Sequence, residues 1–174
     1  MITYPWFAPV MWTVFALAVV SFVSVIGPYF TGAPWVPMPF DAARRMLQLA
    51  DVRPGETVYD LGSGDGRVLI VAAREFGATA IGAEIDPLRT LISRTAIALL
   101  GLRSRARVAR ANIFDVDLRD ADVVTVYLLP KANARLAPKL RSELKPGARV
   151  VTLTYPIPDW EPVVRDGGIH VYRI

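Results

Sequence analysis

The sequence of 174 residues contains no cysteine and a single histidine, His170. The absence of cysteine excludes a disulfide framework, a thiolate nucleophile and a thiolate metal site, and one histidine excludes a histidine metal cluster, so no metal site is expected. Two phosphate-binding patterns are also missing. No Gly-Lys-Ser/Thr completes a Walker pattern, and the glycine-rich turn lacks the G-x-G-x-x-G spacing of dinucleotide sites. Charge is absent from the amino-terminal part, where no charged residue occurs between Met1 and Phe40.

This uncharged stretch has the length of a membrane span. The 19 residues from Ala8 to Ile26, at about 1.5 Å per residue, come close to crossing a hydrocarbon core of roughly 30 Å. A secretory signal peptide is one alternative, but it would need a basic n-region, which residues 1–6 lack. A buried core helix is the other alternative. We expect residues 1–30 to form a transmembrane anchor. The arginines that follow it, Arg44, Arg45 and Arg53, predict single-pass membrane localisation with the domain in the cytoplasm.

After the anchor, residues 31–40 contain three prolines and predict an extended linker. From residue 41 to 174, apolar strand patterns alternate with helical ones, and the last two strands are joined by two glycines. A helix is predicted from Gly64 to Phe76, a second is predicted to start at Asp86-Pro87, and the third strand is predicted over residues 106–112. This alternation predicts an α/β domain: a Rossmann-like, doubly wound seven-strand sheet, mostly parallel, with an antiparallel final hairpin, preceded by one transmembrane helix. Such sheets bind ligands at the carboxyl ends of their strands.

A glycine-rich turn follows the first predicted strand in the stretch YDLGSGDGRVLI, residues 59–70. A helix amino-terminus there would favour a phosphate, but Asp60 and Asp65 add negative charge at that place. They suit a cationic ligand without phosphate, such as S-adenosylmethionine, which has an α-ammonium and a sulfonium. We expect Asp60 to accept a hydrogen bond from the ammonium. A turn-stabilising role for Asp60 and a helix-capping role for Asp65 are the alternatives.

Two further strand ends carry polar residues. Glu84 ends the second strand, where a carboxylate binds both ribose hydroxyls in dinucleotide folds. Asn112 follows the third strand and is expected to meet the adenine amino group, with the Ile113 backbone at a ring nitrogen; a simple turn is the alternative. The predicted cofactor-binding residues are Asp60, Gly62, Ser63, Gly64, Asp65, Gly66, Glu84, Ile85, Asn112 and Ile113.

These motifs resemble those of the seven-strand, class I S-adenosylmethionine-dependent methyltransferases. More narrowly, PWVPMP, DLGSGDGR and VYLLP in this order resemble the small protein-lysine methyltransferases, which include archaeal broad-specificity enzymes and membrane-anchored mitochondrial relatives. The resemblance covers the linker and nearly the whole domain. Met38 stands where that family usually has a small hydroxyl residue, and Trp35 where it commonly has an aromatic one.

The fourth strand ends at YLLP, residues 127–130, where the methyl acceptor meets the donor in this fold. The sequence lacks the Asn/Asp-Pro-Pro-aromatic motif of enzymes that methylate adenine or glutamine. For a lysine acceptor, an apolar channel disfavours the ammonium form, and aromatic faces hold a cation. Tyr127 and Trp35 are the predicted catalytic residues, with Tyr155 as a further wall. A core position for Tyr127 and an interfacial one for Trp35 are the alternatives.

The sequence therefore predicts a membrane-anchored methyltransferase that acts on protein lysine, with a membrane-associated protein as its substrate. A membrane-tethered small-molecule or lipid methyltransferase, and an S-adenosylmethionine-binding module with little catalysis, are the alternatives. The four arginines of residues 103–110 are interpreted as an exposed turn and the solvent side of the third strand, so no nucleic-acid partner is expected.

Overall fold

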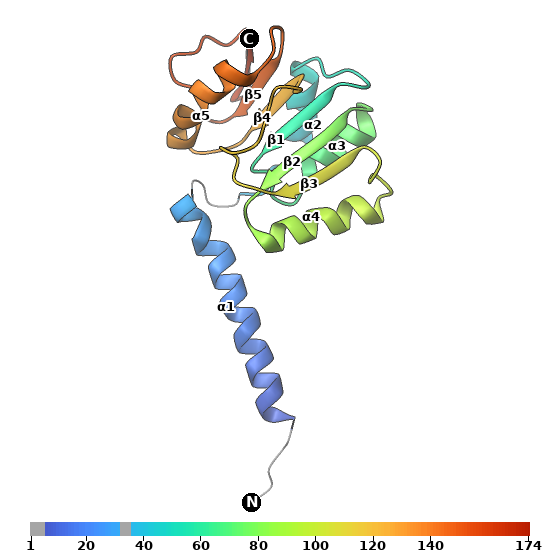
Figure 1. Ribbon diagram of the computed structural model, residues 1–174, viewed down its shortest axis with the longest axis vertical. Helices are drawn as coiled ribbons and strands as arrows, with labels where there is room; N and C mark the ends of the chain where they lie inside the picture. The colour runs from blue at the N-terminus through green and yellow to red at the C-terminus, as the bar shows by residue number, and fades with distance from the viewer. Residues whose placement is uncertain (1–5, 32–35) are drawn as a thin grey trace, which may run out of the picture. The chain divides into compact units, whose positions relative to one another are not determined.

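The computed structural model describes residues 6–31 and 36–174, and the side chains of all of these except residues 20 and 23–31. The chain divides into two compact units, Met1–Trp35 and Val36–Ile174 (Figure 1). The first contains one described helix, α1 (Phe7–Thr31), whose large apolar side chains are exposed as far as they are described. The second unit begins inside the predicted linker, because Met38 is already buried in its core.

The predicted transmembrane anchor is not found. A membrane-crossing helix needs about 20 consecutive apolar residues to span the hydrocarbon core. The described side chains of α1 end at Phe22, and no helix within the described residues combines the length and the apolar character that a crossing requires. The prediction of an anchor over residues 1–30 is therefore wrong. The predicted single-pass membrane localisation is wrong with it, and the arginines after residue 40 then give no basis for placing the domain in the cytoplasm.

The second unit carries the alternation that the sequence predicts. Its elements are α2 (Phe40–Leu49), β1 (Thr57–Leu61), α3 (Arg67–Glu75), β2 (Thr79–Glu84), α4 (Pro87–Leu99), β3 (Ala106–Arg110), β4 (Val123–Val126), α5 (Pro130–Glu143), β5 (Arg149–Leu153), β6 (Val164–Asp166) and β7 (Ile169–Arg173). The strands form one seven-stranded sheet in the order β3-β2-β1-β4-β5-β7-β6. β1 to β5 are parallel, and β7 runs antiparallel to both β5 and β6. The predicted Rossmann-like sheet with an antiparallel final hairpin is confirmed.

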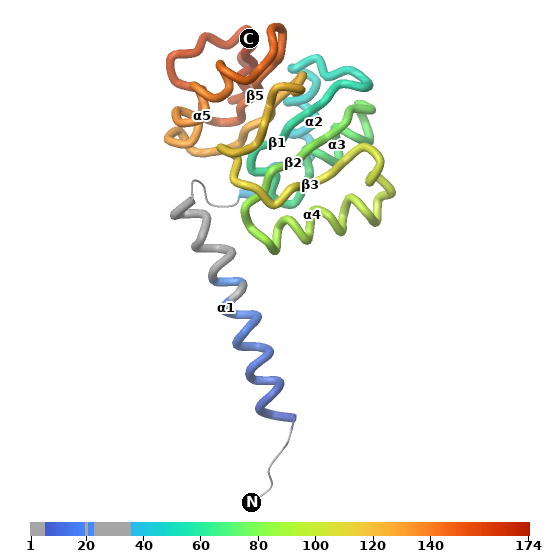
Figure 2. The backbone as a smooth tube through the Cα atoms, in the orientation of Figure 1, coloured from blue at the N-terminus to red at the C-terminus, as the bar shows by residue number. Residues whose placement is uncertain are grey.

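The order of the strands determines where a ligand can bind. β1 has β2 on one side and β4 on the other, so the chain reverses its direction of winding between β1 and β4, a path that can be followed along the tube in Figure 2. Ligands bind at such a reversal, outside the carboxyl ends of the strands. The glycine-rich turn follows β1 and residues 127–130 follow β4, which brings both predicted motifs to this edge.

Two hydrophobic clusters cover the two faces of the sheet. α2, α3 and α4 lie on one face, where Met46, Leu69 and Ile97 share a cluster with the β1 residue Val58. α5 lies on the other face, where Leu136 and Leu140 pack with Val124 and Val150 (Figure 1). The sheet is therefore doubly wound, as expected for strands that are apolar on both sides.

The ends of several elements differ from the prediction for local reasons. The helix after β1 begins at Arg67 instead of residue 64, because Gly64 and Gly66 have positive φ angles that a helix does not allow. β3 stops at Arg110, because Asn112 turns the chain. α4 begins as predicted: Pro87 is its first residue, and Asp86 accepts a hydrogen bond from the backbone N–H of Arg89 (2.8 Å).

Candidate active site

The glycine-rich turn is held against the end of β2 by its own backbone. The N–H groups of Gly62 and Ser63 both donate to the carbonyl of Ala83, at 2.9 and 3.0 Å. Gly62, Gly64 and Gly66 have φ angles of +85°, +53° and +84°, in the region that residues with a Cβ rarely adopt. A Cβ at Gly62 would lie 3.1 Å from Leu128 Cδ2. The turn thus lies close against the residues that follow β4, and it presents backbone there instead of side chains.

Replacing Gly66 with Ala is expected to destabilise the protein by about 2–5 kcal/mol, from a left-handed backbone cost of about 1–2 and an overpacking cost of about 1–3. The new Cβ would overlap Ser93 Oγ of α4. Urea denaturation measures the loss. Gly55→Ala is the matched control, since Gly55 also has a positive φ (+85°) but no heavy atom within 4 Å of its Cβ position. Adding Ser93→Ala should bring the cost of Gly66→Ala down to that of the control; equal costs for the two single variants would contradict this account.

Glu84, at the end of β2, is buried and ties two loops together. Its Oε2 accepts from the backbone N–H of Gly64 at 2.8 Å, and its Oε1 accepts from the backbone N–H of Asp86 at 2.9 Å. A carboxylate can accept about four hydrogen bonds, so each oxygen keeps a lone pair after these contacts. Glu84 is therefore more than a solvated charge at a strand end: it fixes the turn and can still accept from hydroxyl groups.

Asp60, near the end of β1, is buried beneath the same turn. Its Oδ1 accepts a hydrogen bond of 2.7 Å from Thr125 Oγ1 on β4, with which Asp60 is in register. Burial raises the pKa of Asp60 from 3.8 to about 7; the Thr125 hydrogen bond opposes this rise, and the charges of Glu84 and Asp65 add to it. The structure thus contains a carboxyl group whose charged form is costly, which a cationic ligand group would relieve.

Asp65 has a different partner from the one predicted. Its carboxylate pairs with Arg67 Nε at 2.8 Å, and Arg67 Nη1 donates to the carbonyl of Met38 at 2.9 Å. The guanidinium also lies 5.2 Å from the centre of the Phe40 ring. Gly66, not Asp65, is the N-cap of α3, and it provides no side-chain cap. Asp65 and Arg67 therefore fasten the start of the domain beside the glycine-rich turn.

The predicted adenine-binding residues lie after β3. Asn112 Oδ1 accepts from the backbone N–H of Phe114 at 3.2 Å, which is the simple turn considered as the alternative. Ile113 packs against the cluster on the α5 face. Ile85, directly after Glu84, is 43% exposed. The structure brings these side chains to the carboxyl edge of the sheet that also carries Asp60 and Glu84.

The residues after β4 form the opposite wall of this edge. Tyr127 is partly buried and packs against the cluster on the α2–α4 face, while Leu128 packs on the α5 face and contacts the glycine-rich turn. Tyr155 is 38% exposed, and its carbonyl accepts from Asn133 Nδ2 of α5 at 2.9 Å. Trp35, the other predicted catalytic residue, lies outside the described residues.

The residues present at this edge fit S-adenosylmethionine. Three carboxylates gather there, which suits the positive charge of that molecule, and only Asp65 among them has a cationic partner within the described part of the chain. Ser63 Oγ is buried without a hydrogen-bond partner. Sequence reasoning missed Thr125, Asn133 and Arg67. A threonine within the otherwise all-valine strand VVTV was the available signal for Thr125.

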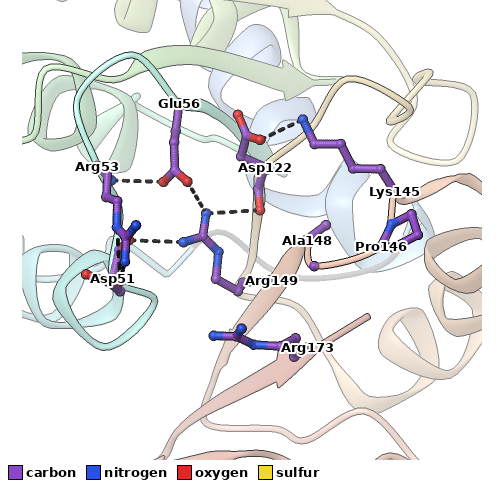
Figure 3. Close-up of a pocket in the computed structure, with 10 residues that line it drawn as sticks. Asp51, Arg53, Glu56, Asp122, Lys145, Pro146, Ala148, Arg149 and Arg173 are labelled. Carbon is purple, nitrogen blue, oxygen red and sulfur yellow. Dashed lines mark hydrogen bonds and ion pairs between the residues drawn. The ribbon is translucent and has the colours of Figure 1, made fainter.

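A second polar pocket lies at the opposite edge, where β1, β4 and β5 begin. Figure 3 shows Arg149 at its centre: its Nη2 is 2.6 Å from Glu56 Oε1, and its Nη1 donates to the carbonyl of Asp51 at 3.0 Å. Lys145 pairs with Asp122 at 2.6 Å in the same pocket. Since parallel sheets bind their ligands at the carboxyl ends of the strands, we assign this network to stability.

Arg149→Met is expected to lower the free energy of unfolding by about 3 kcal/mol, because it leaves Glu56 partly buried without its cation. Urea denaturation measures the change. Arg53→Met is the control: Arg53 and its partner Asp51 have side chains 70% and 68% exposed, and a pair so exposed to solvent contributes little to stability. Cofactor affinity should be unchanged in both variants. A loss of affinity in Arg149→Met would mean that this pocket communicates with the carboxyl edge.

Comparison with known proteins places this site among methyltransferases. Residues 60–164 match the ANTKMT methyltransferase domain. A protein-lysine N-methyltransferase of Saccharolobus islandicus (strain REY15A) is 42% identical over 147 residues, covering 82% of this chain and 91% of the relative. The adenine nucleotide translocase lysine N-methyltransferase of Mus musculus is 36% identical over 130 residues, covering 75% of this chain and 56% of that protein. The chain thus spans about half the length of the mouse relative.

Among solved structures, an RNA methyltransferase from Salinibacter ruber in complex with S-adenosyl-L-homocysteine is similar to this chain. The two superimpose with a TM-score of 0.75 at 41% sequence identity, over 79% of this chain and 92% of the other. S-adenosyl-L-homocysteine is what S-adenosylmethionine becomes when it loses its methyl group. The similar proteins are all named methyltransferases and differ in the acceptor that their names give.

Proposed function

This chain belongs to the ANTKMT methyltransferase domain family, and from that premise we propose that it methylates the side-chain amine of lysine in proteins. It is an S-adenosylmethionine-dependent methyltransferase. The observation that carries the choice of lysine is the Saccharolobus relative, which is aligned over 91% of its own length and is named a protein-lysine N-methyltransferase. The absence of an Asn/Asp-Pro-Pro-aromatic motif after β4 supports the same choice.

In this proposal the carboxyl edge of the sheet holds the donor. Asp60 accepts from its ammonium, directly or through water, and Glu84 accepts from its ribose hydroxyls with the lone pairs that Gly64 and Asp86 leave free. Gly62, Ser63, Gly64 and Gly66 give the turn its close approach, with Asp65 beside them, and Ile85, Asn112 and Ile113 border the adenine. When bound, S-adenosylmethionine supplies an electrophilic methyl group on a sulfonium.

The acceptor amine must lose its proton before it can attack. A lysine side chain has a reference pKa of about 10.4, so its neutral form near physiological pH, about 7.4, costs about 4 kcal/mol at 1.36 kcal/mol per pKa unit. Tyr127 and Leu128 provide an apolar wall that disfavours the ammonium, and the Leu128 carbonyl or the Tyr127 hydroxyl orients the amine. The proton that the ammonium loses would pass to water, and the neutral nitrogen would then accept the methyl group that the bound donor supplies, with S-adenosyl-L-homocysteine as the other product. Positioning and desolvation then suffice without a strong general base.

Tyr127→Ala is expected to lower kcat/KM for a protein acceptor about 10-fold or more, because the aromatic wall is lost. Tyr127→Phe separates the two roles: full activity would assign the contribution to the ring, and a similar loss would assign it to the hydroxyl. The affinity for S-adenosyl-L-homocysteine, measured by calorimetry, should stay constant in both variants. An unchanged kcat/KM in Tyr127→Ala would remove Tyr127 from the proposed site, and Trp35→Ala tests the other predicted wall in the same way.

RNA is the second candidate acceptor, because the Salinibacter protein is named an RNA methyltransferase at 41% identity. One experiment distinguishes the two. The purified chain is incubated with donor carrying a radioactive methyl group, a bacterial protein extract and total RNA, and the product is divided between protease and ribonuclease treatment. We expect label that protease releases, with methyl-lysine found by mass spectrometry. Label that only ribonuclease releases would overturn the lysine proposal. A Glu84→Ala variant provides the blank.

A further inference from the structure

Helix α4 presents its faces in the reverse of the usual arrangement. Surface helices normally bury an apolar stripe and expose polar residues. Three of the four buried residues of α4 are polar, namely Arg89, Thr90 and Ser93, and the fourth is Ile97. Four aliphatic residues of the helix are exposed. We name these four residues the α4 stripe: Leu88, Leu91, Ile92 and Leu99, with exposed fractions of 36%, 61%, 47% and 83%. Their spacing places them on one face of the helix over about three turns.

The glycine-rich turn explains the inward face but not the outward one. Ser93 is fully buried, and its Oγ occupies the space that a Cβ at Gly66 would need. Thr90 Oγ1 donates to the carbonyl of Asp86 at 2.8 Å, so its hydroxyl is satisfied within the helix. The close approach of α4 to the glycine-rich turn thus accounts for the small residue at position 93. Nothing in the fold of residues 36–174 requires leucine and isoleucine on its outer face, where each exposed aliphatic group is unfavourable.

The segment that forms and follows α4 carries side-chain charges of one sign only. Residues 87–110 contain six arginines and no carboxylate. Arg94 on α4 donates from Nε to the carbonyl of Val108 at 3.0 Å, and Arg94, Arg103 and Arg107 line a shallow groove between α4 and β3. The surface thus combines an aliphatic stripe with a cationic border. A partner that fits it has apolar groups that face the stripe and acidic groups that face the arginines.

We propose that the α4 stripe and its arginine border form a docking surface for an acidic amphipathic helix of a partner protein. A second copy of this chain would bring the same arginines together, which repel one another. Nucleic-acid bases stack on aromatic side chains, and the α4 stripe has none. An acidic amphipathic helix satisfies both features, since its apolar stripe packs on the leucines and its carboxylates pair with the arginines. α4 starts three residues after Glu84, so the partner would lie beside the cofactor edge.

The test uses a fluorescent peptide of about 18 residues, five helical turns, with leucines in an i, i+3, i+4, i+7 pattern and glutamates elsewhere. An isomer of the same composition, with the leucines scattered, is the peptide control. We expect the striped peptide to bind at least tenfold tighter than its isomer by fluorescence anisotropy, and added salt to weaken that binding. The double variant Leu91→Gln/Leu99→Gln should lose at least tenfold in affinity. Val163→Gln, which changes an equally exposed residue (62%), should lose none.

Several outcomes would overturn the proposal. One is that the parent protein binds the striped peptide and its isomer with equal affinity. Another is that the striped peptide binds the double variant as tightly as the parent. A third is that the parent sediments as a dimer and the double variant as a monomer. Binding of an oligonucleotide or of anionic vesicles that depends on the α4 stripe, with no binding of the striped peptide, would also overturn it. Circular dichroism confirms that each variant is folded. The experiment needs neither donor nor acceptor, so its result is independent of the proposed lysine chemistry.

Discussion

Asp60→Asn should stabilise the cofactor-free protein at neutral and higher pH while it weakens cofactor binding. In the unfolded chain Asp60 titrates near 3.8, and in the folded protein burial raises its pKa to about 7. Between these values the folded state binds one more proton than the unfolded state, so the free energy of unfolding falls as pH rises. The total loss is about 4 kcal/mol once pH exceeds the folded pKa, at 1.36 kcal/mol per unit. Asparagine has no proton to lose and avoids it.

The measurement is urea denaturation of both proteins without cofactor, from about pH 4 to about pH 8. The difference in unfolding free energy should be near zero at the acidic end and reach about 4 kcal/mol in favour of Asp60→Asn at the basic end. Asp117→Asn is the control. Its pairing with Arg119 lowers the pKa of Asp117 to about 2, so its effect changes only below about pH 4 and stays constant in this range. Parallel curves for Asp60→Asn and the parent would show that Asp60 stays charged in the folded protein.

Asp60→Asn should bind the cofactor more weakly, although it makes the cofactor-free protein more stable. Loss of a charge-assisted hydrogen bond to the donor's ammonium is worth about 1.5–3 kcal/mol, so the Kd for S-adenosyl-L-homocysteine, which has the same ammonium, should rise about 10- to 100-fold. In the parent, affinity should increase as pH rises through about 7, because binding then needs no deprotonation of Asp60. In Asp60→Asn this dependence should disappear. A stabilised variant with unchanged affinity would remove Asp60 from the cofactor site and leave it as a turn-stabilising residue.

Glu84→Ala is expected to have the largest effect on binding, because one carboxylate has two tasks. Its removal leaves the backbone N–H groups of Gly64 and Asp86 without their acceptor, at about 1–3 kcal/mol each in stability. It also removes the proposed acceptor for two ribose hydroxyls, so we expect the Kd for S-adenosyl-L-homocysteine to rise 100-fold or more by calorimetry.

Glu143→Ala is the matched control for that variant. Glu143 also accepts a backbone N–H, from Leu118 at 3.1 Å, but it lies on α5. Its loss should cost stability and leave the affinity unchanged. If Glu84→Ala lowered stability while its affinity, measured on the folded fraction, stayed the same, Glu84 would be a loop anchor and not a ribose ligand.

The short-range features of the site were predictable from the sequence. Glycines at 62, 64 and 66 after an apolar strand predicted the turn, and Asp86-Pro87 predicted the start of α4, because caps and positive φ angles depend on neighbouring residues. The contacts of Asp60, by contrast, join residues 65 positions apart. In the sequence, Thr125 is one position of an otherwise apolar strand. Only the register of β1 with β4 puts its hydroxyl on the Asp60 carboxylate.

Helix α4 shows the limit of pattern reasoning most clearly. Its periodicity and caps predicted a helix at the observed place, but the usual rule would turn its leucines inward. In the structure Ser93 packs against Gly66 of the glycine-rich turn, and the α4 stripe lies on the exposed side of the helix. The uncharged amino-terminal stretch is the other case. Composition predicted an anchor there, whereas the described residues contain no helix that could cross a membrane.

The sequence alone determined the alternation of strands and helices, the class of cofactor and the positions of the turns, because these follow from local backbone preferences and from the charge beside one glycine-rich turn. The tertiary structure decided which carboxylate is buried, which residue each one contacts and which face of α4 is exposed. These properties depend on strand register and on packing across the sheet, where residues far apart in the chain compete for the same space. The same packing raises the pKa of Asp60 to about 7.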